Sequence, residues 1–230
     1  MKVGSLFSGI GGLDLGLERA GMSVVWQAEI DPYASAVLAR HWPSVPNLGD
    51  VTTINWEEVE DVDLICGGYP CQPFSVAGDR LGEGDERHLW PSVLDAMRVL
   101  RPRFAVLENV PGHLSLGFGR VLGDLAEIGY DAEWDCVPAS AIGAPHRRDR
   151  VFIVAHPCGE GLEGRWSRRP TRDGAWWDSE PDVDRVAHGI SFRVDRTRCI
   201  GNAVVPQVAE HVGRALISAA ALQMQKRASR

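Results

Sequence analysis

Strand-like and helix-like segments alternate from the first residues of the chain. Residues 2–7 predict a strand, and glycines follow at 9, 11 and 12 to open a helix through about Ala20. Residues 24–28 predict a second strand, after which Asp31 and Pro32 supply the N-cap and first-turn proline of a helix to about His41. Two such units in succession predict a parallel sheet, because parallel strands need a crossover connection.

The alternation continues through about residue 155. We expect strands at 62–66, 103–107, 132–137 and 151–155, with helices near 88–100 and 118–128. The predicted fold class is therefore α/β, with a doubly wound and mostly parallel sheet. Apolar spacing in residues 206–225 predicts a final helix that packs back on the sheet.

Composition divides the chain into three parts. Residues 1–156 carry the alternating pattern, whereas residues 157–198 are rich in Gly, Pro, Arg, Asp and Trp and read as a short insertion. Residues 199–230 form a C-terminal segment that returns to the first part. At 230 residues and 25.1 kDa, one α/β domain with a small appendage is expected.

Charge and cysteine content limit the possible partners. The net charge is -7, yet residues 146–172 hold seven arginines against three acids, which suits contact with a polyanion. An exposed basic loop without a function is the alternative. Five scattered cysteines without a Cys-x-x-Cys pair predict neither disulfides nor a metal site. We expect a monomeric cytoplasmic protein with no membrane span and no signal peptide.

Cys71 lies where a predicted buried strand gives way to a loop. The carboxyl ends of strands form the ligand crevice of an open α/β sheet, and Pro70 and Pro73 restrict the backbone around the thiol. A cysteine thiolate is a strong nucleophile near neutral pH when a local positive charge or a base favours its ionised form. Cys71 is therefore a candidate nucleophile, with an ordinary buried cysteine as the alternative.

Five segments in order resemble the DNA (cytosine-5) methyltransferase family of bacterial or phage type. They are Phe7-Ser8-Gly9-Ile10-Gly11-Gly12, Pro70-Cys71-Gln72, Glu108-Asn109-Val110, Arg147-Arg148-Asp149-Arg150 and Gly201-Asn202-Ala203-Val204-Val205-Pro206. The resemblance implies a Rossmann-like fold that binds S-adenosyl-L-methionine and acts on double-stranded DNA, with a cognate restriction endonuclease as a functional partner. It also makes residues 157–198 a short target-recognition region.

The resemblance assigns a cofactor site. Phe7 and Ile30 would flank the adenine, Glu29 would accept hydrogen bonds from the ribose hydroxyls, and Asp50 would reach the adenine amine. A surface turn is the alternative for Asp50. The full set is Phe7, Gly9, Ile10, Gly11, Gly12, Glu29, Ile30, Asp50, Val51, Pro70, Asn202 and Val204. The glycine spacing differs from Gly-x-Gly-x-x-Gly, so a dinucleotide fits poorly.

The same resemblance assigns the chemistry. Cys71 would add to C6 of a cytosine, and Glu108 would protonate or hydrogen-bond N3. If Arg148 and Arg150 begin a strand, both project from one face, where one could reach the cytosine O2 and the other a phosphate or the thiol. His146 stands where the family usually has glutamine. Alone, Glu108 could equally be a helix-capping or surface acid.

Residues 75–87 resemble the loop that closes behind a flipped base. Because the recognition region is short, the chain could be a compact enzyme, could need a partner for target choice, or could be a weakly active relative. Three other functions stay open: a tRNA cytosine-5 methyltransferase, a silent nucleic-acid-binding protein and a nicotinamide-dependent oxidoreductase.

Overall fold

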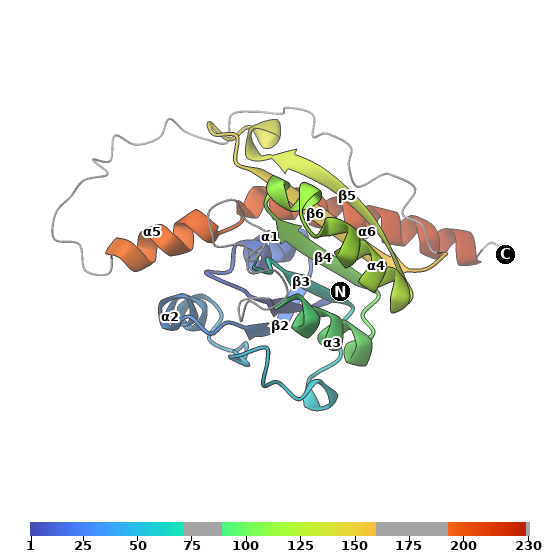
Figure 1. The fold of residues 1–230 in the computed structure, drawn as a ribbon, viewed down its shortest axis with the longest axis horizontal. Coiled ribbons are helices and arrows are strands. Elements are labelled where there is room, and N and C mark those ends of the chain that lie inside the picture. The colour runs from blue at the N-terminus through green and yellow to red at the C-terminus, as the bar shows by residue number, and fades with distance from the viewer. Residues whose placement is uncertain (71–88, 160–192, 229–230) are drawn as a thin grey trace.

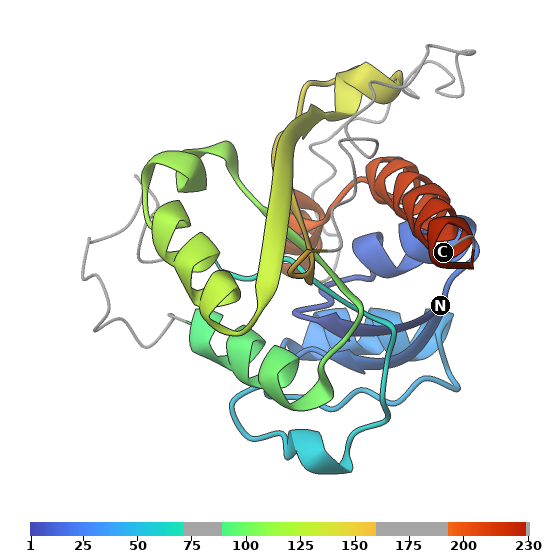
Figure 2. The same ribbon diagram turned by 90° about the vertical axis from the view of Figure 1, so that its right-hand side faces the viewer.

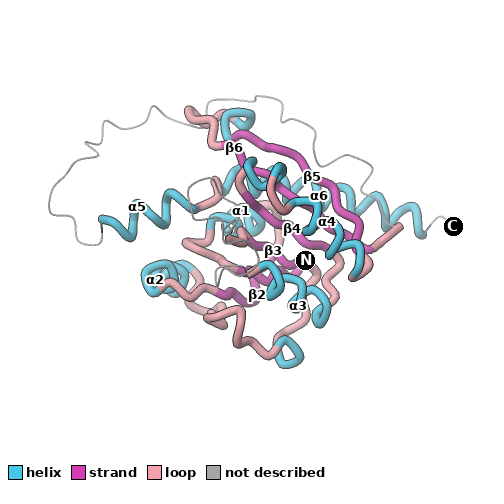
Figure 3. The backbone as a smooth tube through the Cα atoms, viewed as in Figure 1, coloured by secondary structure: helices cyan, strands magenta, loops and turns pink. Residues whose placement is uncertain are grey.

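A six-stranded sheet forms the centre of the computed structural model, which describes residues 1–70, 89–159 and 193–228 (Figure 1). The strand order is β2-β1-β3-β4-β6-β5. Figure 3 shows the strands crossing the molecule side by side. The predicted loop at 75–87 and most of the predicted insertion at 157–198 lie outside the described residues.

Four strands form the parallel part of the sheet, and their positions confirm the sequence prediction. They are β1 (Lys2–Leu6), β2 (Ser23–Ala28), β3 (Leu64–Gly67) and β4 (Phe104–Asn109). β6 (Asp149–Pro157) pairs antiparallel with β4, and β5 (Tyr130–Pro138) pairs antiparallel with β6 at the edge. The carboxyl ends of β1 to β4 therefore share one edge.

Helices cover both faces of the sheet. α1 (Gly12–Arg19) and α6 (Pro206–Ala228) lie on one face, while α3 (Trp90–Leu100) and α4 (Phe118–Glu127) lie on the other, as Figure 2 shows. β4 serves both layers, because Phe104 and Val106 pack on the α1 side and Ala105 and Leu107 on the α3 side. This alternation confirms a doubly wound sheet.

The last helix lies beside the first, and this position fits the predicted return of residues 199–230 to the first part of the chain. A Cβ atom at Gly16 of α1 would come within 2.3 Å of the Pro206 carbonyl oxygen, and one at Gly213 of α6 within 2.9 Å of the Ala20 Cβ. The two backbones can approach this closely because neither glycine carries a side chain. The C-terminal segment thereby returns to the start of the chain.

Three further helical elements matter for the site. α2 (Pro32–His41) begins as predicted, with Asp31 as N-cap and proline in its first turn. The short 3₁₀ helix η3 (Pro111–Ser115) follows β4. α5 (Arg193–Asn202) is not predicted by the sequence and crosses the boundary that we placed between residues 198 and 199. No helix in the described ranges is long and apolar enough to span a membrane.

Candidate active site

A cavity of about 290 Å³ opens at the carboxyl ends of the parallel strands. Its walls come from the ends of β1 to β4, from the start of α2 and from the junction of α5 and α6. The lining includes most of the predicted cofactor residues: Phe7, Gly9, Gly12, Glu29, Ile30, Pro70, Asn202 and Val204, together with Glu108. A ligand crevice at this edge is the usual arrangement in open α/β sheets.

The glycine-rich turn bends sharply between β1 and α1. Phe7, Gly9 and Gly11 all have positive φ values, of 50°, 56° and 80°. Gly11 is the N-cap of α1 and has no side chain, so among the described residues no side chain caps the first backbone N–H groups of the helix. A Cβ atom at Gly12 would lie 2.4 Å from the Val204 carbonyl oxygen. Glycine at position 12 therefore lets the two ends of the chain meet at the cavity.

Glu29 fixes the turn from the end of β2. Its Oε2 accepts a hydrogen bond from Gly9 N at 2.7 Å, and its Oε1 accepts one from Asp31 N at 2.7 Å. Each carboxylate oxygen has two lone pairs, so each can accept a further hydrogen bond. Glu29 lines the cavity and is half-buried, which leaves it suited to bind a pair of neighbouring hydroxyl groups.

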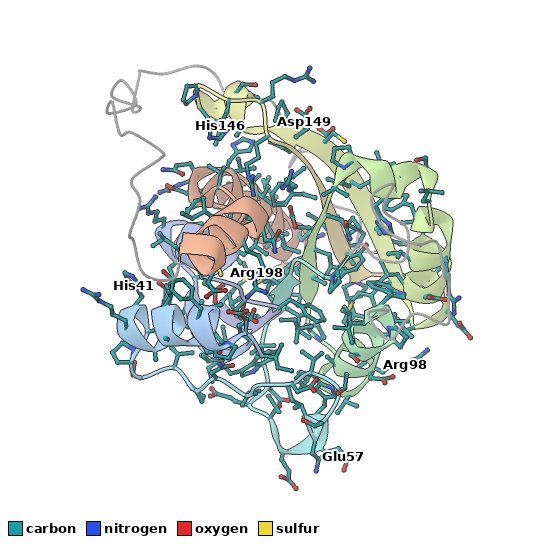
Figure 4. The ribbon with its side chains drawn as sticks, turned by 60° about the vertical axis from the view of Figure 1, so that its left-hand side comes forward. His41, Glu57, Arg98, His146, Asp149 and Arg198 are labelled. Carbon is teal, nitrogen blue, oxygen red and sulfur yellow. The ribbon has the colours of Figure 1, made fainter. Side chains whose placement is uncertain are left out.

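α5 closes one side of the cavity through Arg198. Its guanidinium is paired with the Asp31 carboxylate, and both residues line the cavity. Asp31 Oδ1 also accepts a hydrogen bond from Ala34 N at 2.9 Å, which caps α2. Figure 4 shows Arg198 between α5 and α2. The sequence analysis assigned no role to Arg198, although it lies in the segment just before the Gly201-Asn202 motif.

Glu108 lies at the end of β4 and is 7% exposed. Its Oε1 is 2.7 Å from the Nε of Arg150, which forms an ion pair. Burial raises the pKa of Glu108 to about 7, although Arg150 and Arg148 act to lower it. A Cβ at Gly68 would lie 2.9 Å from the Glu108 Oε2, so a glycine is needed beside the carboxyl group. Glu108 can therefore hold a proton near neutral pH.

Arg148 and Arg150 do not share a strand face, which corrects one expectation. Arg148 precedes β6 and has a φ of 38°, so the backbone turns between the two arginines. The Arg148 guanidinium donates a hydrogen bond to the Gly201 carbonyl at 2.7 Å and also bonds the Ala203 carbonyl. Arg148 therefore links the start of β6 to the C-terminal end of α5, while Arg150 pairs with Glu108.

Several predicted residues lie away from the cavity lining in the described part of the chain. Asp50 accepts hydrogen bonds from Thr52 N at 2.9 Å and Thr52 Oγ1 at 2.8 Å, and Val51 is buried in the core. Ile10 and Gly11 belong to the turn but are not part of the lining. Cys71 lies outside the described residues, directly after Pro70.

The chain is similar in sequence to a known protein family and to individual proteins. The family model described as C-5 cytosine-specific DNA methylase matches residues 1–172. The chain is 37% identical over 164 residues to Type II methyltransferase M2.BsuMI of Bacillus subtilis, covering 67% of this chain and 42% of the relative. It is 39% identical over 153 residues to Type II methyltransferase M.NgoMIV of Neisseria gonorrhoeae, covering 64% of this chain and 49% of the relative.

A solved structure of a prophage-encoded DNA modification methyltransferase from E. coli is also similar. It shares 32% identity and superposes with a TM-score of 0.58, covering 68% of this chain and 47% of that chain. The chain thus spans less than half the length of these three proteins.

Proposed function

The chain belongs to the C-5 cytosine-specific DNA methylase family, and on this premise we propose that it transfers a methyl group from S-adenosylmethionine to C5 of cytosine in double-stranded DNA. The observation that carries the proposal is the Glu108 carboxyl group. It is buried against Arg150, it lines the cavity with Pro70, and it can hold a proton near pH 7.

The cavity suits S-adenosylmethionine, which when bound supplies an electrophilic methyl group on sulfur. Glu29 has two oxygens that can accept the ribose hydroxyls, and Phe7 and Ile30 offer apolar surface for the adenine. The uncapped N-terminus of α1 favours a negative group such as the carboxylate of the methionine part. Asp50 keeps its proposed contact with the adenine amine, because Thr52 N and Thr52 Oγ1 both bond its Oδ1 and a carboxylate has a second oxygen that can accept.

The chemistry needs a nucleophile because cytosine C5 does not attack a methyl donor unaided. In the proposed reaction the Cys71 thiolate bonds to C6, and the displaced electron pair reaches N3, where Glu108 supplies the proton. C5 then takes the methyl group, whose bonding electrons stay on the donor sulfur as a neutral thioether. Loss of the C5 proton to a base expels the thiolate from C6 and restores the C5–C6 double bond, and N3 returns its proton to Glu108.

Arg150 has a defined part in this proposal. Its ion pair with Glu108 orients the carboxyl group, and its charge limits how far burial raises the pKa of that group. Arg148 instead connects β6 to the wall of the cofactor cavity through the carbonyls at the end of α5. We therefore propose that Arg150 acts beside the cytosine, where Glu108 supplies its proton. Arg148 joins β6 to the wall of the cofactor cavity.

Covalent trapping tests the proposal. Duplex oligonucleotides that contain 5-fluorocytosine should form an adduct with the protein in the presence of S-adenosylmethionine, because the C5 fluorine cannot leave as a proton does. Cys71→Ser should form none, whereas Cys136→Ser, at an exposed thiol on β5, should react like the wild type. Transfer of tritium from the labelled cofactor to tRNA but not to duplex DNA would overturn the DNA assignment.

The relatives named above are Type II methyltransferases, which supports a cognate restriction endonuclease as a functional partner. Bisulfite sequencing of plasmid from cells that express the chain would give the target sequence. Unmodified cytosine throughout, despite a folded protein, would count against the activity of this chain alone.

A further inference from the structure

We infer that Tyr69 is a positioning residue, which fixes the backbone leading into Cys71 through one contact to Asn109 and one to His113. The inference rests on the proposed function and extends it to Tyr69 and His113, which lie outside the five family segments, and to Asn109, to which the resemblance assigned no role. Tyr69 follows the end of β3, is 4% exposed, and stands two residues before Cys71.

The first contact holds the main chain. The side-chain amide of Asn109 donates to the Tyr69 carbonyl oxygen at 3.2 Å, while the Asn109 Oδ1 accepts from Val110 N at 2.8 Å. Asn109 is the last residue of β4 and adjoins Glu108, and it is 3% exposed. One strand end therefore carries both the acid of the proposed reaction and the amide that anchors the segment before the nucleophile.

The second contact holds the side chain. The Tyr69 hydroxyl lies 2.8 Å from the Nε2 of His113, which belongs to η3 and is 2% exposed. Burial lowers the pKa of His113, which favours the neutral ring, so either the Tyr69 hydroxyl or the His113 Nε2–H donates the hydrogen bond, according to the tautomer. A buried hydrogen bond between two neutral groups has a defined direction and restricts both side chains.

Aromatic packing completes the restraint. The Tyr69 ring lies 5.1 Å from the ring of Trp90 in α3 and 5.5 Å from that of His113. The His113 ring in turn meets Phe118 of α4 edge-on at 5.8 Å. Tyr69 is thus held directly by β4, η3 and α3, and α4 supports it through the contact of Phe118 with His113, so its backbone cannot shift without disturbing several packed elements.

Placement near Glu108 gives this restraint a catalytic consequence. Gly68, directly before Tyr69, passes so close to β4 that a Cβ there would lie 2.9 Å from the Glu108 Oε2. If the chain after Tyr69 is displaced, the distance changes between the Cys71 sulfur and the cytosine ring that Glu108 protonates. A misplacement of about 1 Å can cost on the order of a hundredfold in rate. The alternative is that Tyr69 and His113 form only a stabilising core pair.

The variant Tyr69→Phe distinguishes a positioning role from a purely stabilising one, with Tyr130→Phe as a matched control. Tyr130 is 2% exposed and its hydroxyl donates to the Pro102 carbonyl at 2.6 Å, at the far end of β4 from Glu108. Each variant loses one buried tyrosine hydroxyl. The measurement is the rate of covalent adduct formation with 5-fluorocytosine duplex at saturating DNA and cofactor, together with the Kd for S-adenosylmethionine and the thermal unfolding midpoint.

We expect Tyr69→Phe to slow adduct formation by about tenfold, with a cofactor Kd within about twofold of the wild type. Tyr130→Phe should lower the unfolding midpoint to a similar extent and react at the wild-type rate. His113→Phe provides a second variant if Tyr69→Phe does not fold, and it should also slow adduct formation.

Equal rates in Tyr69→Phe and Tyr130→Phe would overturn the positioning role and leave the proposed function intact. Wild-type protein that forms no adduct would instead remove the proposed function, and the positioning role with it.

Discussion

Arg150 Nε lies 2.7 Å from Glu108 Oε1, so a permanently charged guanidinium faces a carboxyl group whose pKa is nonetheless raised. Burial disfavours the ionised carboxylate more strongly than the two arginines favour it, which brings the pKa of Glu108 to about 7. The balance suits a group that must donate a proton and later recover it near neutral pH.

The rate of adduct formation should therefore fall as the pH rises through about 7. The folded protein favours protonated Glu108 relative to an ordinary glutamate, so the proton is present below this pH and is lost above it. Glu108→Gln cannot donate the proton and should react about a hundredfold to ten-thousandfold more slowly. Its residual rate should lack this fall with pH.

Glu127→Gln is the matched control, because Glu127 is exposed on α4. Its rate of adduct formation and the pH dependence of that rate should match the wild type in quenched time courses between pH 5.5 and 8.5. A Glu108→Gln variant that keeps the wild-type rate and slope would show that another group supplies the proton.

Gly12→Ala should destabilise the fold by about 1–3 kcal/mol, because its Cβ would lie 2.4 Å from the Val204 carbonyl oxygen. It should also weaken S-adenosylmethionine binding, since the displaced segment lines the cavity. Gly123→Ala adds the same methyl group on the exposed side of α4, where nothing lies within 4 Å, and should stabilise by about 0.5–1 kcal/mol. Urea unfolding and calorimetry measure both effects. An unaltered Gly12→Ala protein would contradict the close approach of the two chain ends.

The strands could be predicted because buried strands leave a strong signal in the sequence. Phe104 to Leu107 is a continuous apolar run, as a strand covered on both faces requires. The last helix could also be predicted, since the apolar spacing of residues 206–225 indicated a helix that packs back on the sheet. In both cases local pattern and global fold agree.

α5 could not be predicted, because its sequence has no apolar stripe. Its residues, Arg193 to Asn202, include four charged side chains and one exposed isoleucine, Ile200. Tertiary contacts hold the helix: Arg148 bonds its last carbonyls, and Arg198 pairs with Asp31. The left-handed backbone at Arg148, which separates it from Arg150, is likewise set by these contacts rather than by the spacing of two residues.

We expect the free energy of unfolding to depend on pH through Asp14. It is fully buried in α1 and accepts hydrogen bonds from Ser5 Oγ at 3.0 Å and Gln27 Nε2 at 2.9 Å. Burial raises the pKa of Asp14 to about 6, so its stabilising contribution is present at low pH and is lost as the pH rises from about 4 through 6. The loss amounts to roughly 3 kcal/mol.

Asp14→Asn should remove this part of the pH dependence and raise the unfolding free energy near pH 7. Gln27 can accommodate the change, because its Oε1 is buried, accepts no hydrogen bond from the described residues, and could accept one from the new amide after a flip. Urea unfolding of both proteins at pH 4, 5, 6 and 7 gives the difference directly. A constant difference across this range would contradict the raised pKa of Asp14.

Arg198→Ala should weaken S-adenosylmethionine binding by about threefold to tenfold, because the loss of a preorganised wall raises the cost of ordering α5 around the ligand. The ion pair with Asp31 is 56% exposed on the arginine side, so the unfolding free energy should change by less than about 1 kcal/mol. Arg98→Ala is the matched control, since Arg98 forms an exposed pair with Asp95 on α3 at 3.2 Å, well apart from Arg198 (Figure 4). Calorimetric titration without DNA measures both affinities. Equal affinity in the two variants would show that α5 closes the cavity without help from Arg198.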